Sequence, residues 1–341
     1  MTYVPDEMDA VVLDAYSGPA SLRVARRAVP KPGPGQVLVK IAASPMNPSD
    51  IAFIHGNYGF RSPPPVVPGQ EGAGTVVAAG AGMIGRYFLN KRVACLKMEE
   101  GDGMWAEYAL ASAVGGVLPL SAAVGMEQGA MSAINPMTAC AFLEIARRGG
   151  HRAFALTPGA SSLGQMVNRL ARRRGVEVIN VVRRRAQVDL LRDQGVTVVL
   201  NSSDEDFVER LRDACREHDC HLAFDAVAGP STHQLLDAMP HNSKVTVFSG
   251  LSKQPARAGI DHLVFEGKSV DGFWLGPWLL KKNPLGILRT WRRAQALVPT
   301  ALESTIRERV PLQDAARAMR EYMDRMTGGK FLLEPGLTAG S

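Results

Sequence analysis

The segment from Ala153 to Arg185 has the residue types and the spacing to hold a phosphate group. Residues 153–157 predict a buried strand, and a Pro-Gly-Ala-Ser-Ser-Leu-Gly turn follows it. Four apolar residues then recur at i, i+3, i+4 and i+7, the pattern of one buried helix face: Leu163, Met166, Val167 and Leu170. Because the first N–H groups of a helix lack internal partners and lie at the positive end of its dipole, this turn predicts a pyrophosphate site.

The second strand of this unit, residues 178–182, ends in Arg183, Arg184 and Arg185. A module that prefers NAD usually carries a carboxylate here, about 20 residues past the turn, to bind the ribose hydroxyls. Guanidinium groups instead bind a 2′-phosphate in a bidentate manner. We therefore predict NADP(H) as the cofactor. The alternative for the arginine run is a solvated basic turn.

The rest of the chain shows two patterns of elements. Short β-branched runs separated by Gly and Pro, at 8–13, 36–42, 72–78 and 91–96, predict a compact, mostly β domain in the N-terminal third. From residue 126 onward helices alternate with strands, which predicts a doubly wound parallel sheet. The expected strands are 153–157, 178–182, 196–200, 221–225, 244–248 and 269–274, and the expected helices are 127–148, 163–174, 186–194, 204–217 and 232–239. Residues 330–333 are a further candidate strand for the β domain.

Composition argues against several classes of protein. A chain of 341 residues that is 46% hydrophobic is long enough for two globular domains. Its net charge of +6 comes without the aromatic-interleaved basic stripe of a nucleic-acid-binding protein. Gly and Pro break the longest uncharged run, 109–126, so we expect no membrane span. The four cysteines lack metal-ligand or disulfide spacing, and the acidic N-terminus is unlike a signal peptide, so we expect a cytoplasmic protein with reduced thiols.

Several short motifs follow one another in a recognisable order: Asn47-Pro48-Ser49-Asp50, Gly56-Asn57-Tyr58-Gly59, Pro68-Gly69-Gln70-Glu71-Gly72, Ile134-Asn135-Pro136-Met137-Thr138-Ala139, Asp225-Ala226-Val227, Gly272-Phe273-Trp274-Leu275, Val310-Pro311-Leu312-Gln313-Asp314 and Gly329-Lys330. Over nearly the whole chain they resemble the medium-chain dehydrogenase/reductase superfamily, and most of all its zinc-free branch of quinone oxidoreductases and 2-enoyl thioester reductases. Ser161, at the place of the middle glycine of G-x-G-x-x-G, also resembles the enoyl thioester reductases. The resemblance implies an α/β protein with a GroES-like, mostly β catalytic domain (1–130 with 277–341) and a Rossmann NADP-binding domain (131–276).

The resemblance also bears on metal binding. Zinc-dependent members carry a Cys near Asn47 and a His at the position of Gln70, and Asn and Gln are poor zinc ligands. We therefore expect no catalytic metal. Without a Lewis acid, hydride transfer from NADPH to a conjugated, electron-poor acceptor is easier to arrange than oxidation of an alcohol. A reductase is accordingly favoured over an alcohol dehydrogenase.

Reduction of an α,β-unsaturated thioester passes through an enolate, and a proton must then reach its α-carbon. By resemblance, Tyr58 is the acid or the donor that orients the substrate, and Asn47 lines the substrate pocket. The alternative for Tyr58 is an ordinary half-buried aromatic in a loop. Because quinone reduction needs a dedicated acid less strictly, Tyr58 also separates the two reductase hypotheses.

The resemblance assigns the remaining site residues to the cofactor. The nicotinamide contacts are Asn135 and Thr138, the backbone contacts to the pyrophosphate are Ala160, Ser161, Ser162 and Leu163, the residues along the nicotinamide ribose are Phe248, Ser249, Gly250 and Leu251, the residues flanking the nicotinamide are Phe273, Trp274, Leu275 and Gly276, and Lys330 resembles a cofactor-contacting lysine. Three alternatives stay open: a helix cap for Asn135, side-chain packing for the apolar 273–275 run, and a solvated turn lysine for Lys330.

Three hypotheses for function result. The first is an NADPH-dependent reductase of 2-enoyl thioesters carried by coenzyme A or acyl carrier protein. The second is an NADPH:quinone or activated-alkene reductase that acts on small electrophiles. The third is a cofactor-binding regulatory protein without activity. The resemblance further implies a homodimer, and we expect neither nucleic acid nor a membrane as a partner.

Overall fold

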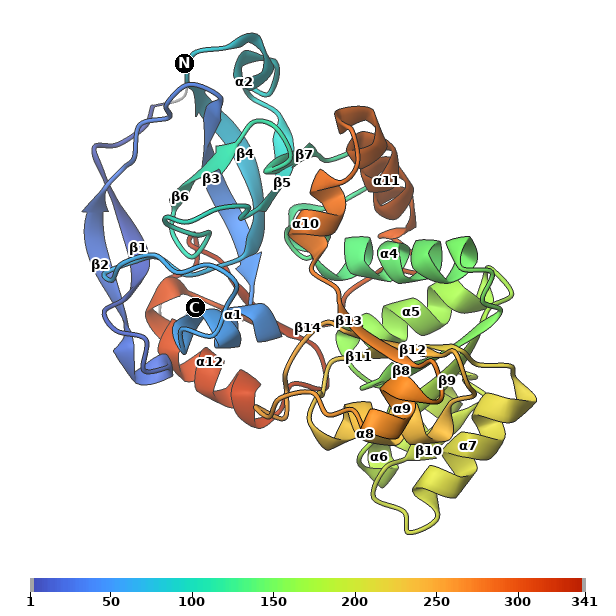
Figure 1. Cartoon of the computed structure of the whole chain (residues 1–341). Coiled ribbons are helices and arrows are strands. Elements are labelled where there is room, and N and C mark those ends of the chain that lie inside the picture. Colours follow the sequence, from blue (N-terminus) through green and yellow to red (C-terminus); the bar gives the residue numbers. More distant parts are fainter. Residues whose placement is uncertain (1–2, 339–341) are drawn as a thin grey trace. The chain divides into compact units, whose positions relative to one another are not determined.

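The computed structural model describes residues 3–338, and its contacts divide the chain into two units (Figure 1). The β unit comprises Met1–Met137 and Lys282–Ser341, and the Rossmann unit comprises Thr138–Lys281. The predicted domains, 1–130 with 277–341 and 131–276, differ from these units by a few residues at each boundary. Residues 131–137 belong with the β unit because the N–H groups of Ala133 and Ile134 bond to Glu71 in that unit.

The β unit is built on a seven-stranded sheet of order β14-β15-β3-β4-β5-β7, in which β6 also pairs with β3, and on a separate β1-β2 ribbon. Its strands are β1 (Glu7–Leu13), β2 (Leu22–Ala28), β3 (Gln36–Pro45), β4 (Glu71–Ala79), β5 (Arg92–Leu96), β6 (Tyr108–Ser112), β7 (Val117–Pro119), β14 (Ile306–Val310) and β15 (Lys330–Leu333). Its helices are α1 (Pro48–Ile54), α2 (Met83–Tyr87), α3 (Met126–Ala130), α11 (Pro284–Leu297) and α12 (Ala315–Asp324). The C-terminal strand β15 returns to this unit, pairing Leu332 with Pro45 and Leu333 with Ser44.

The Rossmann unit holds a six-stranded, fully parallel sheet of order β10-β9-β8-β11-β12-β13. Its strands are β8 (Ala153–Thr157), β9 (Glu177–Val182), β10 (Val199–Asn201), β11 (Leu222–Asp225), β12 (Lys244–Val247) and β13 (Ser269–Gly272), and its helices are α5 (Ser162–Arg172), α6 (Arg185–Asp193), α7 (Phe207–Glu217), α8 (Pro230–Ala238), α9 (Ile260–Val264) and α10 (Leu275–Leu280). Counted along the chain, this is the 3-2-1-4-5-6 order of dinucleotide-binding folds, whose order reverses between β8 and β11. The predicted doubly wound sheet is therefore confirmed.

Alternation along the central strand decides which helices cover which face of the sheet. Ala153 and Ala155 of β8 join the apolar core formed with α7 and α8. Phe154 points the other way and meets the ring of Phe224, which stacks at 3.9 Å on Phe142 of α4 (Asn135–Arg148). Successive side chains of a strand point to opposite faces of the sheet. Helices α7 and α8 therefore cover the face with the two alanines, and α4 covers the face with the phenylalanine.

The structure corrects one helix of the sequence prediction. The single helix expected over residues 127–148 is two helices, α3 and α4, with residues 131–134 between them. A continuous helix would leave the N–H groups of Ala133 and Ile134 bonded within it, whereas here both donate to a buried carboxylate. Among residues 3–338, none of the helices has both the length and the apolar character needed to cross a membrane.

Candidate functional site

The turn after β8 leaves backbone N–H groups at the start of α5 available to a ligand. Ser161 caps α5: its Oγ accepts from the Gly164 N–H at 3.0 Å and donates to the Pro158 carbonyl at 2.9 Å. Within the described part of the chain, the N–H groups of Ser162 and Leu163 have no hydrogen-bond partner. Since those groups lie at the positive end of the α5 dipole, they are the donors available to a phosphate.

Neither glycine of the turn has room for a Cβ atom. A Cβ on Gly164 would lie 2.1 Å from the Gly159 carbonyl oxygen, and a Cβ on Gly159 would lie 2.5 Å from Oδ1 of Asn180 on β9. Asn180 in turn exchanges hydrogen bonds of 2.8 and 2.9 Å with Asn168 of α5. The turn, the helix and the second strand are thereby locked together, so the unpartnered N–H groups have a fixed direction.

The arginine run lies where the sequence predicts it, at the end of β9 beside this turn. The Gly159 N–H donates to the Val181 carbonyl at 2.9 Å, which ties the turn to that strand end. All three arginines are exposed. Arg185 pairs with Asp189 at 3.3 Å, whereas Arg183 and Arg184 form no ion pair with any residue that the structure describes. Arg183 and Arg184 are therefore the guanidinium groups available to a 2′-phosphate.

The other predicted cofactor residues of this unit follow the strands β12 and β13. Phe248 and Phe273 direct their rings onto Phe142, with centroid distances of 4.9 and 5.2 Å. This packing agrees with the alternative that the apolar side chains hold the fold while their backbone faces a ligand. Ser249, Gly250 and Leu251 continue from β12, Trp274 is 43% exposed, Leu275 and Gly276 begin α10, and Thr138 lies within α4.

In the β unit, the structure brings Asn47 and Lys330 together although they are 283 positions apart. Lys330 is only 2% exposed, and its Nζ donates to Oδ1 of Asn47 and, at 3.3 Å, to the carbonyl of Met46. The alternative of a solvated turn lysine is therefore wrong. Burial lowers the pKa of the Lys330 ammonium to about 8, although Glu71 and Asp50 act against that shift.

Glu71 is the hub of this buried cluster, and the sequence analysis did not single it out. One oxygen accepts from Nδ2 of Asn47 at 3.0 Å, and the other accepts from the N–H groups of Ala133 and Ile134 at 3.0 and 2.8 Å. Burial raises the pKa of Glu71, and Lys330 counteracts part of that shift. Because Ile134 directly precedes Asn135, Glu71 fixes the backbone at the start of α4.

Asp50 is a second missed member of the cluster. Its two oxygens accept from the N–H of Asn47 at 2.8 Å and from the N–H of Gln70 at 3.0 Å. Burial raises the pKa of Asp50 to about 7. The spacing Asn47-x-x-Asp50 around a proline is a helix N-terminus signature, so the sequence carried a signal for the first of these bonds but none for the second.

Tyr58 lies in the loop after α1 and is half-buried. Its ring meets Phe60 edge-on at 4.9 Å, and Phe60 meets Phe53 of α1 at 6.5 Å. The loop is pinned farther on, where the Tyr16 hydroxyl donates to the Ser62 carbonyl at 2.7 Å. Tyr58 is therefore presented from an ordered aromatic platform in the β unit.

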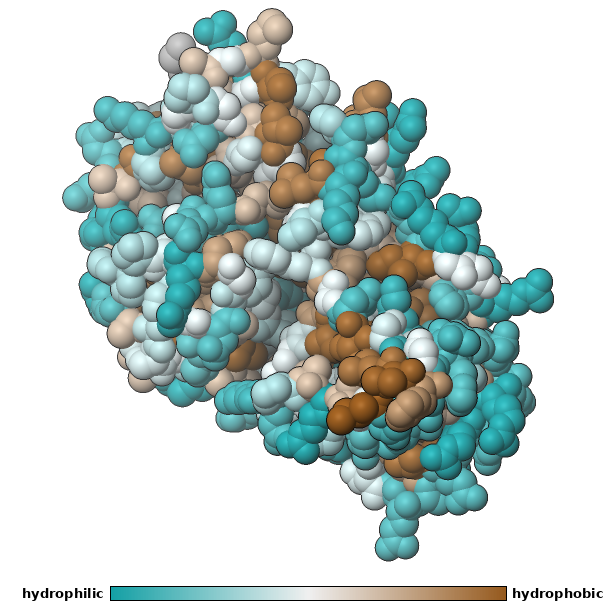
Figure 2. Space-filling model, viewed as in Figure 1, coloured by the Kyte–Doolittle hydropathy of each residue, from teal (hydrophilic) through white to brown (hydrophobic). Residues whose placement is uncertain are grey.

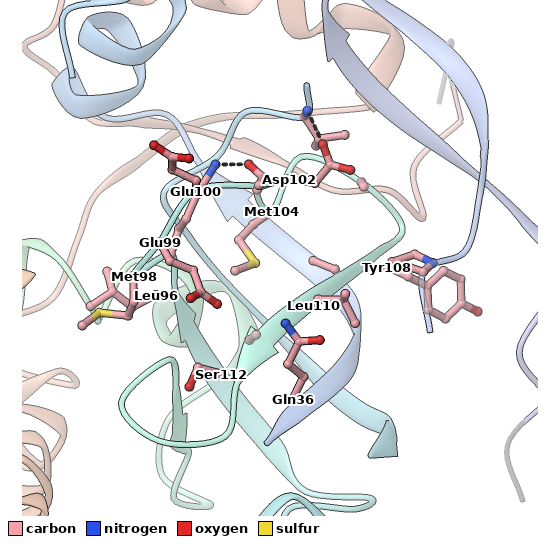
Figure 3. A pocket seen from close by; sticks show the side chains of 18 of the residues that line it. Gln36, Leu96, Met98, Glu99, Glu100, Asp102, Met104, Tyr108, Leu110 and Ser112 are labelled. Atoms are coloured by element: carbon pink, nitrogen blue, oxygen red, sulfur yellow. Dashed lines mark hydrogen bonds between the residues drawn. The ribbon is translucent and has the colours of Figure 1, made fainter. Parts of the chain in front are cut away.

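A cavity of about 190 Å³ also opens in the β unit, but it contains none of the predicted site residues (Figure 3). Its wall includes the exposed acidic residues Glu99, Glu100 and Asp102 together with Met104 and Tyr108. Lys97 is the one basic residue that lines this cavity, against three acidic ones, so the wall carries net negative charge and would repel an anionic ligand. The cavity is accordingly no candidate for a phosphate-bearing cofactor.

One group in the Rossmann unit has ligands at metal-binding spacing: His233, Asp237 and His262. Nε2 of His262 lies 2.8 Å from Asp237, but its Nδ1 accepts from the Gly259 N–H at 3.2 Å. A histidine that binds a metal through Nε2 normally donates its other N–H to an acceptor. His262 faces a donor instead, so the group fits a hydrogen-bonded link between α8 and α9 better than a metal site.

Comparison with known proteins places this geometry in a family. Residues 33–122 match the alcohol dehydrogenase GroES-like domain, and residues 162–284 match the zinc-binding dehydrogenase domain. A solved structure of a putative NADPH:quinone reductase from Mesorhizobium loti is 34% identical, with a TM-score of 0.90 over 98% of this chain and 100% of that one. The chain belongs to the medium-chain dehydrogenase/reductase superfamily. It is an oxidoreductase of that superfamily, as the sequence analysis predicted.

Curated relatives of this chain are named enoyl-[acyl-carrier-protein] reductases. The mitochondrial enoyl-[acyl-carrier-protein] reductase of Bos taurus is 28% identical over 96% of this chain and 89% of its own length. The Arabidopsis thaliana protein of the same name is 30% identical over 79% of this chain and 72% of its own. The superfamily is thus confirmed, and both reductase hypotheses have named relatives.

Proposed function

We propose that this protein reduces the conjugated double bond of a 2-enoyl thioester, carried by coenzyme A or acyl carrier protein, with NADPH as the hydride donor. The proposal rests above all on Tyr58, a hydroxyl held on an ordered aromatic platform in the β unit. The names of the curated relatives support it. The Mesorhizobium loti structure supports the runner-up, a quinone or activated-alkene reductase.

The residues of the Rossmann unit fit NADP(H). The N–H groups of Ser162 and Leu163 would bind the pyrophosphate, and Arg183 and Arg184 would bind the 2′-phosphate. Asn135, Thr138, the backbone of 248–251 and that of 273–276 are proposed along the nicotinamide half. When bound, NADPH supplies the hydride that adds to the β-carbon of the substrate.

In the β unit, Tyr58 would deliver the proton to the α-carbon or orient the enolate that forms. For Asn47 we propose a structural part in place of the substrate-pocket role that the resemblance implies, because Glu71 and Lys330 each hydrogen-bond to one end of its amide. Lys330, equally engaged, holds this cluster together. We propose that neither side chain contacts the substrate or cofactor directly. We also propose that the reaction needs no zinc, since Asn47 and Gln70 offer poor ligands.

The function is tested by following NADPH consumption with a medium-chain trans-2-enoyl-CoA beside an aromatic quinone. Tyr58→Phe keeps the ring against Phe60 and removes the acid, so thioester turnover should fall by about 10²- to 10⁴-fold. The exposed Tyr87 provides a matched control, since Tyr87→Phe should leave turnover unchanged. Turnover on quinone alone, insensitive to Tyr58→Phe, would establish the runner-up. Saturable NADPH binding with no turnover on either substrate would favour the regulatory protein.

We further propose that the Rossmann unit mediates a homodimer. Strand β13 is the edge of its sheet and pairs with β12 on one side. Beside it, α9 and the residue after it expose four large apolar side chains, the brown patch over α9 in Figure 2: Ile260 (76% exposed), Leu263 (49%), Val264 (65%) and Phe265 (77%). An open edge next to an apolar helix is suited to a second copy of the chain. Phe265→Asp should convert the dimer to a monomer in sedimentation, and a wild-type monomer would refute the proposal.

A cytoplasmic location stays a prediction.

A further inference from the structure

Gln70 holds the one side-chain amide in the described β unit whose two ends are both buried and both without a hydrogen-bond partner. It is 1% exposed and directly precedes β4. Its backbone is fully engaged, since the N–H donates to Asp50 at 3.0 Å and the carbonyl accepts from the Lys97 N–H at 2.9 Å. The backbone of Gln70 is therefore held in place, whereas its side-chain amide has no hydrogen-bond partner.

Asp50, which accepts from the backbone N–H of Gln70, and Glu71, which follows Gln70 in the chain, form hydrogen bonds with other groups and none with the Gln70 amide. Both oxygens of Asp50 accept backbone N–H groups, and both oxygens of Glu71 are engaged. Asn47 gives its Nδ2 to Glu71 and its Oδ1 to Lys330. An amide such as that of Gln70 is unusual, since an unpaired buried polar group costs stability and most buried polar atoms are hydrogen-bonded.

We propose that the Gln70 amide is a binding site for the carbonyl oxygen of the substrate, with Nε2–H as the donor. The inference rests on the proposed function, in which that oxygen gains negative charge as the enolate forms. A neutral donor that is already desolvated and fixed gains strength as that charge develops, and it requires no reorganisation at that moment. In this proposal Tyr58 acts at the α-carbon of the substrate and Gln70 acts at its carbonyl oxygen.

The first test measures ligand recognition without turnover. Decanoyl-CoA and its thioether analogue S-decyl-CoA differ in the carbonyl oxygen, and both are titrated into protein saturated with NADP⁺. The wild type should bind decanoyl-CoA about 10- to 100-fold more tightly, as expected for a hydrogen bond in a desolvated site. Gln70→Met keeps the length of the side chain and removes the donor, so this preference should disappear. Gln70→Leu serves as the second variant if the first does not fold.

The second test measures stability and turnover of the same variants. Removing an unpaired buried amide should raise the melting temperature of the ligand-free protein by a few degrees, while kcat/KM for a trans-2-enoyl-CoA should fall by about 10²- to 10³-fold. Ser304 provides the matched control, because its Oγ is also buried without a partner. Ser304→Ala should raise stability and leave kcat/KM unchanged.

The outcomes separate this inference from the proposed function. If the wild type reduces the enoyl thioester and Gln70→Met keeps both turnover and the preference for decanoyl-CoA, Gln70 binds only a buried water and the inference is overturned. If the wild type neither binds nor reduces thioesters, the proposed function fails and the inference fails with it. Loss of the preference with intact binding of S-decyl-CoA supports both.

Discussion

Replacing Lys330 by methionine tests whether the buried cluster is held together by charge. The Lys330 ammonium lies among Asp50 and Glu71, each 0% exposed. Removing one partner of a buried ion pair typically costs about 3–5 kcal/mol, because an uncompensated charge stays behind. Lys330 reaches Glu71 through Asn47 and not through a direct ion pair, so we take the lower end of that range. Methionine keeps most of the apolar stem, so this cost should dominate. Protonation of Asp50, whose pKa is about 7, relieves part of it below that pH.

We therefore expect Lys330→Met to lower the free energy of unfolding by about 3 kcal/mol at pH 7.5, where Lys330, with a pKa of about 8, is still mostly charged, and by less at pH 6. The assay is urea unfolding followed by circular dichroism at both pH values. Lys40→Met, at an exposed position on β3, is the control and should change stability by less than about 0.5 kcal/mol. A loss below about 1 kcal/mol at pH 7.5 would refute the view that Lys330 compensates the buried carboxylates.

A double-mutant cycle with Glu71→Gln tests whether Lys330 fixes the orientation of the Asn47 amide. In the single variant, the new amide N–H₂ must face either Asn47 Nδ2 or the two backbone donors, and Asn47 cannot turn because its Oδ1 accepts from Lys330. With Lys330→Met also present, Asn47 is free to turn and accept from that group. The double variant should therefore be less destabilised than the sum of the two single variants by about 1–3 kcal/mol. Simple additivity would contradict the proposed contacts.

Three further predictions concern the pH dependence and the cofactor turn. Asp50 has a folded pKa raised from 3.8 to about 7, so its contribution to stability is greatest below pH 4 and is lost as the pH rises towards 7; the stability difference between wild type and Asp50→Asn should shrink by at least about 1 kcal/mol between pH 5 and pH 8 in urea titrations. Gly164→Ala forces the Gly159 carbonyl to shift and should cost about 1–3 kcal/mol and weaken NADPH binding, whereas Gly125→Ala, with open space around it, should do neither. Arg183→Glu should weaken NADPH far more than NADH in fluorescence titrations, and equal losses would rule out the 2′-phosphate assignment.

The parts of the fold that the sequence predicted are those fixed by local periodicity. The β8–α5–β9 unit has its signals within about 30 residues, namely the apolar stripe of α5, the capping Ser161 and the arginines after β9. The parallel sheet follows from repetition of such units. Element ends shifted by a few residues, since Arg184 is not a typical cap and Asp206 is one of several adjacent candidate caps before α7, with Ser203 and Asp204.

The sequence carries a local signal for the break between α3 and α4 but not for its cause. Asn135-Pro136 is a helix-start signal inside the predicted 127–148 helix, whereas the residues just before it are held by a carboxylate more than 60 positions upstream, Glu71. Nothing in the local sequence indicates that Ala133 and Ile134 will donate to it. Likewise, the Asn47-x-x-Asp50 signature predicts a cap but not the bond from Asp50 to Gln70.

Lys330 shows why the sequence alone can give the wrong surroundings for a residue. A lysine after Gly328-Gly329 reads as exposed, because the desolvation cost of a buried ammonium is not visible in the sequence. That cost is met only when β15 pairs with β3, which brings Lys330 to Asn47 and the two carboxylates. Every member of the cluster therefore depends on a contact between distant segments, and its neutralised charges leave Gln70 as the unpaired donor. If that is so, removing Lys330 should disturb the carbonyl preference and lower stability, whereas removing Gln70 should abolish the preference and raise stability.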